Sequence, residues 1–186
     1  MEQVSPPRPP SKLSTKGLVQ VFTGNGKGKT TAALGTVIRA LGHGLRVYIV
    51  SFMKGDYPYG EWNILAQLPG VGFARFGSRG FINPKNITPE DREQARRALA
   101  SAREAVLSGS YDLVVLDEVN LAVAWKLVEL DDMIKLINDK PRNVELILTG
   151  RKADAKLIQL ADLVTECRNI KHPYEKGIKA RQGIEY

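Results

Sequence analysis

The sequence predicts an α/β fold, in which a mostly parallel sheet is flanked by helices within a single domain. Three observations support this. Short apolar runs alternate with helical patterns along most of the 186 residues. A glycine-rich loop lies between an apolar run and an amphipathic run, and a later apolar run ends in a pair of acids. A chain of this length is most simply one domain.

The first element is a buried strand over Leu18–Phe22, followed by the glycine-rich loop and by a helix that runs through Ala32–Leu41. Each later apolar run of strand length is separated from the next by a helical or irregular segment. This alternation is typical of βαβ units with parallel strands. The five further strands are predicted at Arg46–Met53, Val71–Phe76, Leu113–Leu116, Val144–Leu148 and Leu163–Cys167.

Two further helices are predicted from their boundaries. Thr88 can cap a helix that has Pro89 in its first turn and Asp91 three residues on, which resembles a capping box. An apolar stripe at helical spacing then continues to Ser108, and Gly109 ends the helix. A shorter helix is predicted over Asp131–Asn138 before Pro141.

The glycine-rich loop has the pattern of a P-loop, with a strand before it and a helix after it. Its backbone N–H groups and the helix N-terminus would face phosphate oxygens. Lys29 would place a positive charge on the phosphates, and the Thr30 hydroxyl would bind Mg²⁺. Thr23 stands where the standard pattern has its first glycine, and no third glycine fits a dinucleotide-binding pattern. The expected nucleotide-binding residues are Gly24, Asn25, Gly26, Lys27, Gly28, Lys29, Thr30 and Thr31.

The acid pair at Asp117 and Glu118 ends the strand predicted at Leu113–Leu116. Such a pair matches the Walker B pattern, in which a carboxylate at a strand end holds Mg²⁺ directly or through water. We expect Thr30 and Glu118 to hold the metal, with Asp117 as a further ligand or as a partner behind the ligands. Arg151 follows the next strand and should face the same crevice.

Composition restricts the classes of function. The formal net charge is +7, with the basic surplus at both ends of the chain. A basic surplus suits a polyanionic small ligand. The sequence has no basic strand interleaved with aromatic residues, which argues against nucleic acid as the ligand. The single cysteine, the absence of an apolar run of 18 residues and the lack of a secretory signal predict a cytoplasmic protein without a membrane span.

The ends of the chain and two loops are expected to surround the site. Residues 1–16 are rich in proline and lysine and are predicted to be a flexible segment before a domain at 17–186. Residues 54–60 and 77–87 follow the second and third strands and look irregular. Loops at the carboxyl ends of parallel strands line the ligand crevice, so both loops belong on the same edge as the P-loop.

Taken together, these residues resemble a known family. The loop at Gly24–Ala33, the runs Leu116-Asp117-Glu118 and Leu148-Thr149-Gly150-Arg151, and the end of the chain at Lys171–Tyr174 and Gly177–Tyr186 are similar to the P-loop type of ATP:corrinoid adenosyltransferase. The resemblance covers nearly everything from Gly17 onward. It is specific, because ordinary P-loop ATPases lack this final segment.

The resemblance implies a RecA-like fold, a homodimer and Mg²⁺-ATP. Because the expected metal ligands are oxygen donors, Mn²⁺ should substitute for Mg²⁺. The resemblance implies transfer of the 5′-deoxyadenosyl group to the cobalt of a cob(I) corrinoid, with release of triphosphate, in cobalamin biosynthesis or salvage. The corrinoid would be cobalamin, cobinamide or cobyrinic acid diamide, reduced by a donor such as a flavodoxin-like reductase. It also implies ATP bound in the reverse sense, with the γ-phosphate in the loop, which would account for the unusual loop.

Lys29, Phe81 and Arg151 are then the expected catalytic residues. Phe81 matches a family phenylalanine that crowds the lower face of the corrinoid and drives off its lower axial ligand. In the family a tryptophan follows two residues later, where this chain has Asn83.

Two other classes of function remain open from the sequence. One is a RecA-like ATPase that couples hydrolysis to binding of nucleic acid or a partner, although the chain is short for that role. The other is a non-catalytic nucleotide-binding regulator, which the acid pair disfavours. The inorganic product formed from ATP distinguishes the three: triphosphate, ADP with phosphate, or none.

Overall fold

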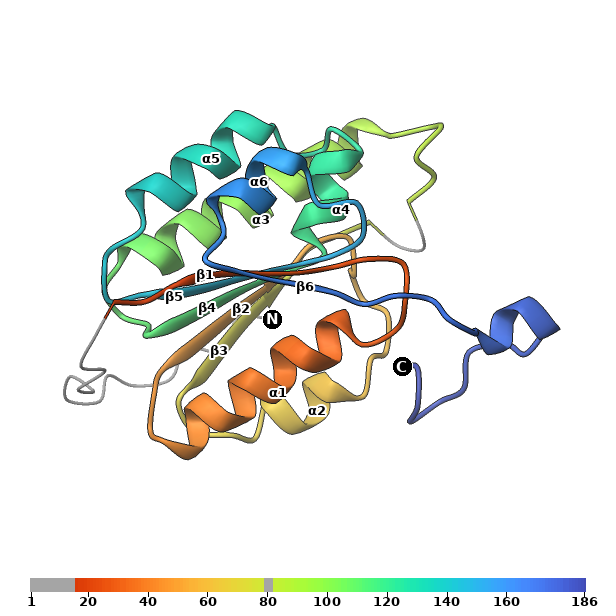
Figure 1. Ribbon diagram of the computed structural model, residues 1–186, viewed down its shortest axis with the longest axis horizontal. Coiled ribbons are helices and arrows are strands. Elements are labelled where there is room, and N and C mark those ends of the chain that lie inside the picture. The colour runs from red at the N-terminus through yellow and green to blue at the C-terminus, as the bar shows by residue number, and fades with distance from the viewer. Residues whose placement is uncertain (1–15, 79–81) are drawn as a thin grey trace.

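The computed structural model describes residues 16–78 and 82–186. Its centre is a six-stranded sheet in which every pair of neighbouring strands is parallel, in the order β3-β2-β4-β5-β1-β6 (Figure 1). The α/β fold and the parallel sheet are therefore confirmed. The strands are β1 Val19–Thr23, β2 Val47–Ser51, β3 Val71–Arg75, β4 Leu113–Asp117, β5 Glu145–Thr149 and β6 Leu163–Glu166.

The central strands are almost continuously apolar because both of their faces are covered. All five residues of β2 and of β4 are buried, whereas all four residues of β6 are exposed at the edge of the sheet. Parallel sheets covered on both faces produce such apolar runs in place of alternation. All six predicted strands are present, with ends that differ by at most two residues.

Helices cover both faces of the sheet (Figure 1). On one face, α1 and α2 bury Val37 and Trp62 against a cluster that includes Ile49 and Ile147. On the other face, α3 to α6 pack on a larger cluster that includes Met133 and Leu157. The helices are α1 Lys29–Gly42, α2 Glu61–Leu65, α3 Pro89–Leu107, α4 Val119–Ala124, α5 Leu130–Asp139 and α6 Ala155–Leu160, and a 3₁₀ turn, η1, spans Pro173–Lys176.

The capping box predicted for α3 is present. The Thr88 side chain accepts a hydrogen bond from the Asp91 N–H, and the Asp91 carboxylate accepts one from the Thr88 N–H. Reciprocal bonds of this kind satisfy N–H groups that the first helical turn leaves without partners. Ala95, Ala102 and Val106 of the predicted stripe are buried, so this helix is held by its cap and its core face.

The carboxyl ends of the strands meet at one edge of the sheet, where β1, β2, β4 and β5 all end in loops. The last part of the chain leaves β6 at this edge and curls beyond the sheet, where η1 lies (Figure 1). No helix in the described part of the chain is both long and apolar enough to cross a membrane.

Candidate functional site

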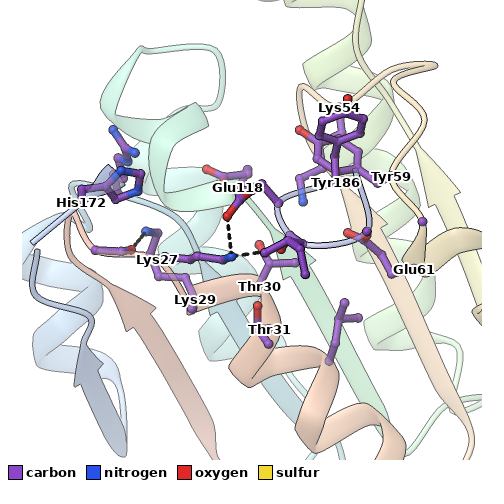
Figure 2. A pocket seen from close by; sticks show the side chains of 18 residues that line it. Lys27, Lys29, Thr30, Thr31, Lys54, Tyr59, Glu61, Glu118, His172 and Tyr186 are labelled. Carbon is purple, nitrogen blue, oxygen red and sulfur yellow. Dashed lines mark hydrogen bonds and ion pairs between the residues drawn. The ribbon is translucent and has the colours of Figure 1, made fainter. Parts of the chain in front are cut away.

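A cavity of about 640 Å³ lies at the carboxyl edge of the sheet. The P-loop, the end of β4 and the loop after β5 contribute to its lining, as do the loop after β2 and the last residues of the chain (Figure 2). Its volume is that of an ordinary small-molecule site. The lining residues that carry the argument below are Lys27, Lys29, Thr30, Lys54, Tyr59, Glu118, Arg151, Glu185 and Tyr186.

The glycines of the loop have two structural tasks. Gly28 precedes α1 with φ of 120°, a conformation that favours glycine. A Cβ on Gly24 or Gly26 would lie 2.4 or 2.6 Å from the carbonyl oxygen of Cys167 or Arg168, which no side chain tolerates. The Gly26 N–H donates a 2.7 Å hydrogen bond to the Cys167 carbonyl. These two glycines thus let the segment after β6 pack directly on the loop.

Lys29 is folded back over the loop. Its Nζ donates a 2.6 Å hydrogen bond to the Gly26 carbonyl, and the residue is buried. Burial lowers the pKa of Lys29, and the nearby Arg151 lowers it further, whereas Glu118 raises it. Burial has removed hydration from the ammonium, and phosphate oxygens bound in the loop would replace it with charge-assisted hydrogen bonds.

Asp117 is the point where three elements meet. The Thr30 hydroxyl donates a 2.8 Å hydrogen bond to Asp117 Oδ1, and the Thr149 hydroxyl donates one of 2.7 Å to the same oxygen. The Glu118 N–H in turn donates to the Thr149 hydroxyl at 2.9 Å. Asp117 therefore fixes the Thr30 hydroxyl of the P-loop relative to β4 and β5.

The other carboxylate oxygen of Asp117 is paired with Lys54. Lys54 Nζ lies 2.6 Å from Asp117 Oδ2, and the two side chains are only 8% and 2% exposed. Burial lowers the pKa of Lys54, but the charge and hydrogen bond of Asp117, together with the charges of Glu118 and Tyr59, raise it by more, so the net shift is upward. Sequence reasoning placed the loop after β2 at this edge but assigned no role to Lys54. A lysine directly after a buried strand was the available signal.

Glu118 has an unusual backbone. Its φ of 63° and ψ of 13° are left-handed, which is uncommon outside glycine. This turn directs β4 into α4 at the rim of the cavity. Burial and the charge of Asp117 raise the pKa of Glu118, and the cations Lys54, Lys29 and Arg151 lower it by less. A carboxylate in this environment is stabilised by a bound cation.

The donor set fits a magnesium ion that is completed by phosphate and water. Thr30 and Glu118 supply a hydroxyl and a carboxylate, and oxygen ligands are what Mg²⁺ requires. Asp117 is already paired with Lys54 and two hydroxyls, so it suits the position behind the ligands. No cluster of three or more His, Cys, Asp or Glu among the described residues could hold a metal alone.

The remaining predicted site residues are distributed as follows. Gly26 to Thr31 and Arg151 line the cavity with Glu118. Asn25 faces a second, neighbouring cavity, and Gly24 lies under the loop against Cys167. Phe81 lies outside the described residues. Asn83 is exposed, and its Oδ1 accepts a hydrogen bond from the Lys85 N–H.

Comparison of the sequence with known proteins identifies the family to which the chain belongs. Residues 15–186 match the model of the ATP:corrinoid adenosyltransferases BtuR/CobO/CobP. The chain is 40% identical over 171 residues to the corrinoid adenosyltransferase of Escherichia coli K12, covering 92% of this chain and 86% of that protein. It is 39% identical, with the same coverage, to the corrinoid adenosyltransferase CobA of Salmonella typhimurium LT2. It is also 36% identical over 179 residues to a corrinoid adenosyltransferase of Sinorhizobium, covering 95% of this chain and 83% of that protein. The chain belongs to the corrinoid adenosyltransferase family.

Proposed function

We propose that this adenosyltransferase uses ATP as the donor of the adenosyl group and a cob(I) corrinoid as the acceptor. The electron pair on Co(I) attacks C5′ of the ribose, and the Co–C bond forms as the C5′–O bond breaks. The bonding electrons leave with the triphosphate, and the cobalt becomes Co(III). The nucleophile carries no proton, so the protein needs no catalytic base.

The gathering of cations at one end of the cavity carries this proposal. Lys29 and Arg151 lie around the P-loop, and Thr30 and Glu118 could hold Mg²⁺ beside them. Negative charge builds up on the triphosphate as the C5′–O bond breaks. Positive groups that are already in place stabilise that charge more in the transition state than in bound ATP.

Magnesium would neutralise part of the triphosphate charge, and Mn²⁺ should replace it because both ions accept oxygen ligands. Asp117 would keep the Thr30 hydroxyl oriented toward the ion, since it already fixes that hydroxyl at 2.8 Å. Lys54 would prevent Asp117 from turning away. In this way Thr30 and Glu118 keep their positions before the nucleotide arrives.

The corrinoid side of the proposal comes from the family resemblance. Phe81 would crowd the lower face of the corrinoid and displace its lower axial ligand, which makes Co(II) easier to reduce. Asn83 has no ring with which to assist. The displacement should therefore be weaker than in relatives with tryptophan there. An external reductase, a homodimer and a role in cobalamin biosynthesis or salvage belong to the same proposal.

The inorganic product of the reaction tests this function. Purified protein is incubated with Mg·ATP and chemically reduced cob(I)alamin or cob(I)inamide, and the Co–C product and the phosphates are quantified. We expect equal amounts of adenosylated corrinoid and triphosphate. Lys29→Ala should reduce the rate by about 10²-fold, or about 3 kcal/mol, and Lys156→Ala on the exposed face of α6 should not change it. ADP and phosphate, formed without corrinoid, would instead identify an ATPase.

A further inference from the structure

The last residues of the chain close a ring of contacts around the cavity. Lys27 of the P-loop donates a 3.0 Å hydrogen bond to the Ile184 carbonyl, and its Nζ lies 3.1 Å from Glu185 Oε1. Arg181 holds Glu185 from the other side, through its N–H at 2.7 Å and its guanidinium at 3.0 Å. The final segment is therefore attached to the P-loop itself.

Tyr186 continues this ring into an aromatic cluster. Its ring centroid lies 5.4 Å from that of Tyr57, edge to face, and Tyr57 lies 4.8 Å from Tyr59. Lys54 lies 4.6 Å from the Tyr59 ring, and it joins the cluster to Asp117. Figure 2 shows Tyr186 grouped with Tyr59 and Lys54. Tyrosines from two segments that are far apart in sequence thus lie together on one side of the cavity.

The cavity consequently has two chemically different ends. Lys29, Thr30 and Arg151 make one end cationic and polar, whereas Tyr59 and Tyr186 make the other aromatic. A nucleoside triphosphate has the same division, with an anionic chain at one end and a flat, largely apolar base at the other. Phosphates seated in the P-loop leave the aromatic end for the base.

We propose that Tyr186 and Tyr59 form the surface that receives the purine base of the nucleotide. Glu185 and Lys27 act as positioning residues that hold Tyr186 at this surface. The proposal rests on the proposed function, because it assumes that the phosphates occupy the P-loop. It makes the final residues of the chain determinants of nucleotide specificity. It also makes Lys27 a partner of Glu185, with Lys29 as the lysine that meets phosphate.

The attachment depends on Glu185 being ionised. Hydrogen bonds from the Arg181 guanidinium and backbone, together with Lys27, lower the pKa of Glu185 to about 2. The carboxylate is therefore ionised throughout the pH range in which an enzyme works. Tyrosine suits the surface at which Glu185 holds Tyr186, since a tyrosine side chain offers a large contact area with few rotatable bonds.

Equilibrium binding of two ligands separates base recognition from phosphate recognition. Mg·ATP and magnesium tripolyphosphate, which lacks the nucleoside, are titrated calorimetrically into wild type, Tyr186→Ala, Tyr186→Phe and Tyr174→Ala. Stacking on an aromatic side chain stabilises a bound base. We expect Tyr186→Ala to weaken ATP binding about tenfold, to leave tripolyphosphate binding unchanged, and to be rescued by Tyr186→Phe. Tyr174 is a matched control, because it is a tyrosine of the same final segment, 77% exposed and outside this cavity.

Glu185→Gln tests the positioning role with a readout that loss of structure would not produce. Releasing Lys27 from Glu185 should let it meet phosphate, so tripolyphosphate should bind more tightly while ATP loses its advantage over tripolyphosphate. The melting temperature should stay within a degree of wild type. A parallel strengthening of both ligands would overturn the positioning role.

Other outcomes would overturn base recognition. These are equal losses of ATP and tripolyphosphate binding in Tyr186→Ala, no loss of either, or a loss confined to binding of the corrinoid. Failure of the proposed function is distinguishable, because it would appear in the wild type as formation of a product other than triphosphate. If wild type makes triphosphate and the Tyr186 variants bind ATP normally, only this inference is refuted.

Discussion

At the scale of residues, Asp117 and Glu118 are neighbours in opposite environments. Asp117 is paired with Lys54 at 2.6 Å and accepts hydrogen bonds from two hydroxyls. Burial and the charge of Asp117 raise the pKa of Glu118. One carboxylate is therefore satisfied by the protein, whereas the other is destabilised when ionised and without a metal. The sequence pattern could predict the acid pair but could not divide these roles, because Lys54 comes from the loop after another strand.

Glu118→Gln should make the metal-free protein more stable, since it removes a buried charge beside Asp117. We expect the melting temperature to rise by a few degrees, at about 2–4 °C per kcal/mol for a chain of this size. The raised pKa also means that the native state binds the proton more tightly than the unfolded state. Wild type should therefore gain stability relative to the variant as the pH falls from neutral toward the ordinary glutamate range.

The same variant should bind manganese at least tenfold more weakly in the presence of ATP, measured by the electron paramagnetic resonance signal of free Mn²⁺. Glu104→Gln, an exposed acid on α3, is the control for both measurements. Unchanged metal affinity together with a lower melting temperature would assign Glu118 a structural role.

Lys54→Met should be strongly destabilising, because it leaves the Asp117 carboxylate buried without its partner. Breaking a buried ion pair in this way costs about 3–5 kcal/mol, which corresponds to a fall of about 10 °C in melting temperature. The double variant Lys54→Met/Asp117→Asn should recover part of this loss, since no uncompensated charge remains. Thermal unfolding of the two single variants and the double variant gives the coupling energy.

A surface pair offers the comparison for this cycle. Lys135 and Asp139 lie 3.3 Å apart on α5, with side chains 63% and 37% exposed. Lys135→Met should change stability by less than about 1 kcal/mol, as is usual for exposed ion pairs. Strictly additive effects of the Lys54 and Asp117 changes would contradict a coupling role for Lys54.

At the scale of elements, the sequence could predict those with a clear period or a strong boundary. The six strands are apolar runs, and α3 has both a capping box and an apolar stripe. By contrast, α2, α4 and α6 have five or six residues each. Such short helices complete too few turns to show a helical period, and packing on the sheet stabilises them more than propensity does.

The glycine loop shows a second limit of prediction at this scale. The sequence pattern explains the loop by its phosphate ligand, but Gly24 and Gly26 are also required by the carbonyl groups of Cys167 and Arg168. Those carbonyls follow β6, more than a hundred residues later in the chain. A spacing rule within one loop holds no information about such a distant backbone, so this constraint appears only in the folded molecule.

At the scale of the whole molecule, the parallel topology brings all the chemistry to one edge. β1, β2, β4 and β5 place the P-loop, Lys54, Glu118 and Arg151 around one cavity, and the segment after β6 returns to cover it. The sequence predicted the shared edge, because parallel strands present their carboxyl ends together. It did not predict that Glu185 and Tyr186 would join the P-loop, since contacts of a chain end have no periodic signature.

The contribution of the N-terminal segment to corrinoid binding can be tested by kinetics. Residues 1–15 lie outside the described residues, and their basic, proline-rich composition suits a cover over an acidic ligand. A deletion should begin the chain at Lys16, because Lys16 Nζ lies 3.6 Å from Asp162 Oδ1 and the Gly17 N–H donates a hydrogen bond to the Arg142 carbonyl. We expect this variant to melt at the wild-type temperature.

The same deletion should raise the KM for the corrinoid by about tenfold while the KM for ATP changes little. A cover that closes over the bound corrinoid stabilises the complex, so its loss raises the KM, and it also excludes water and oxygen from Co(I). Steady-state kinetics with cob(I)alamin, with triphosphate as the product measured, gives both constants. Kinetics identical to those of the full chain would make residues 1–15 a passive extension. A fall in melting temperature would instead show that the segment contributes to the fold.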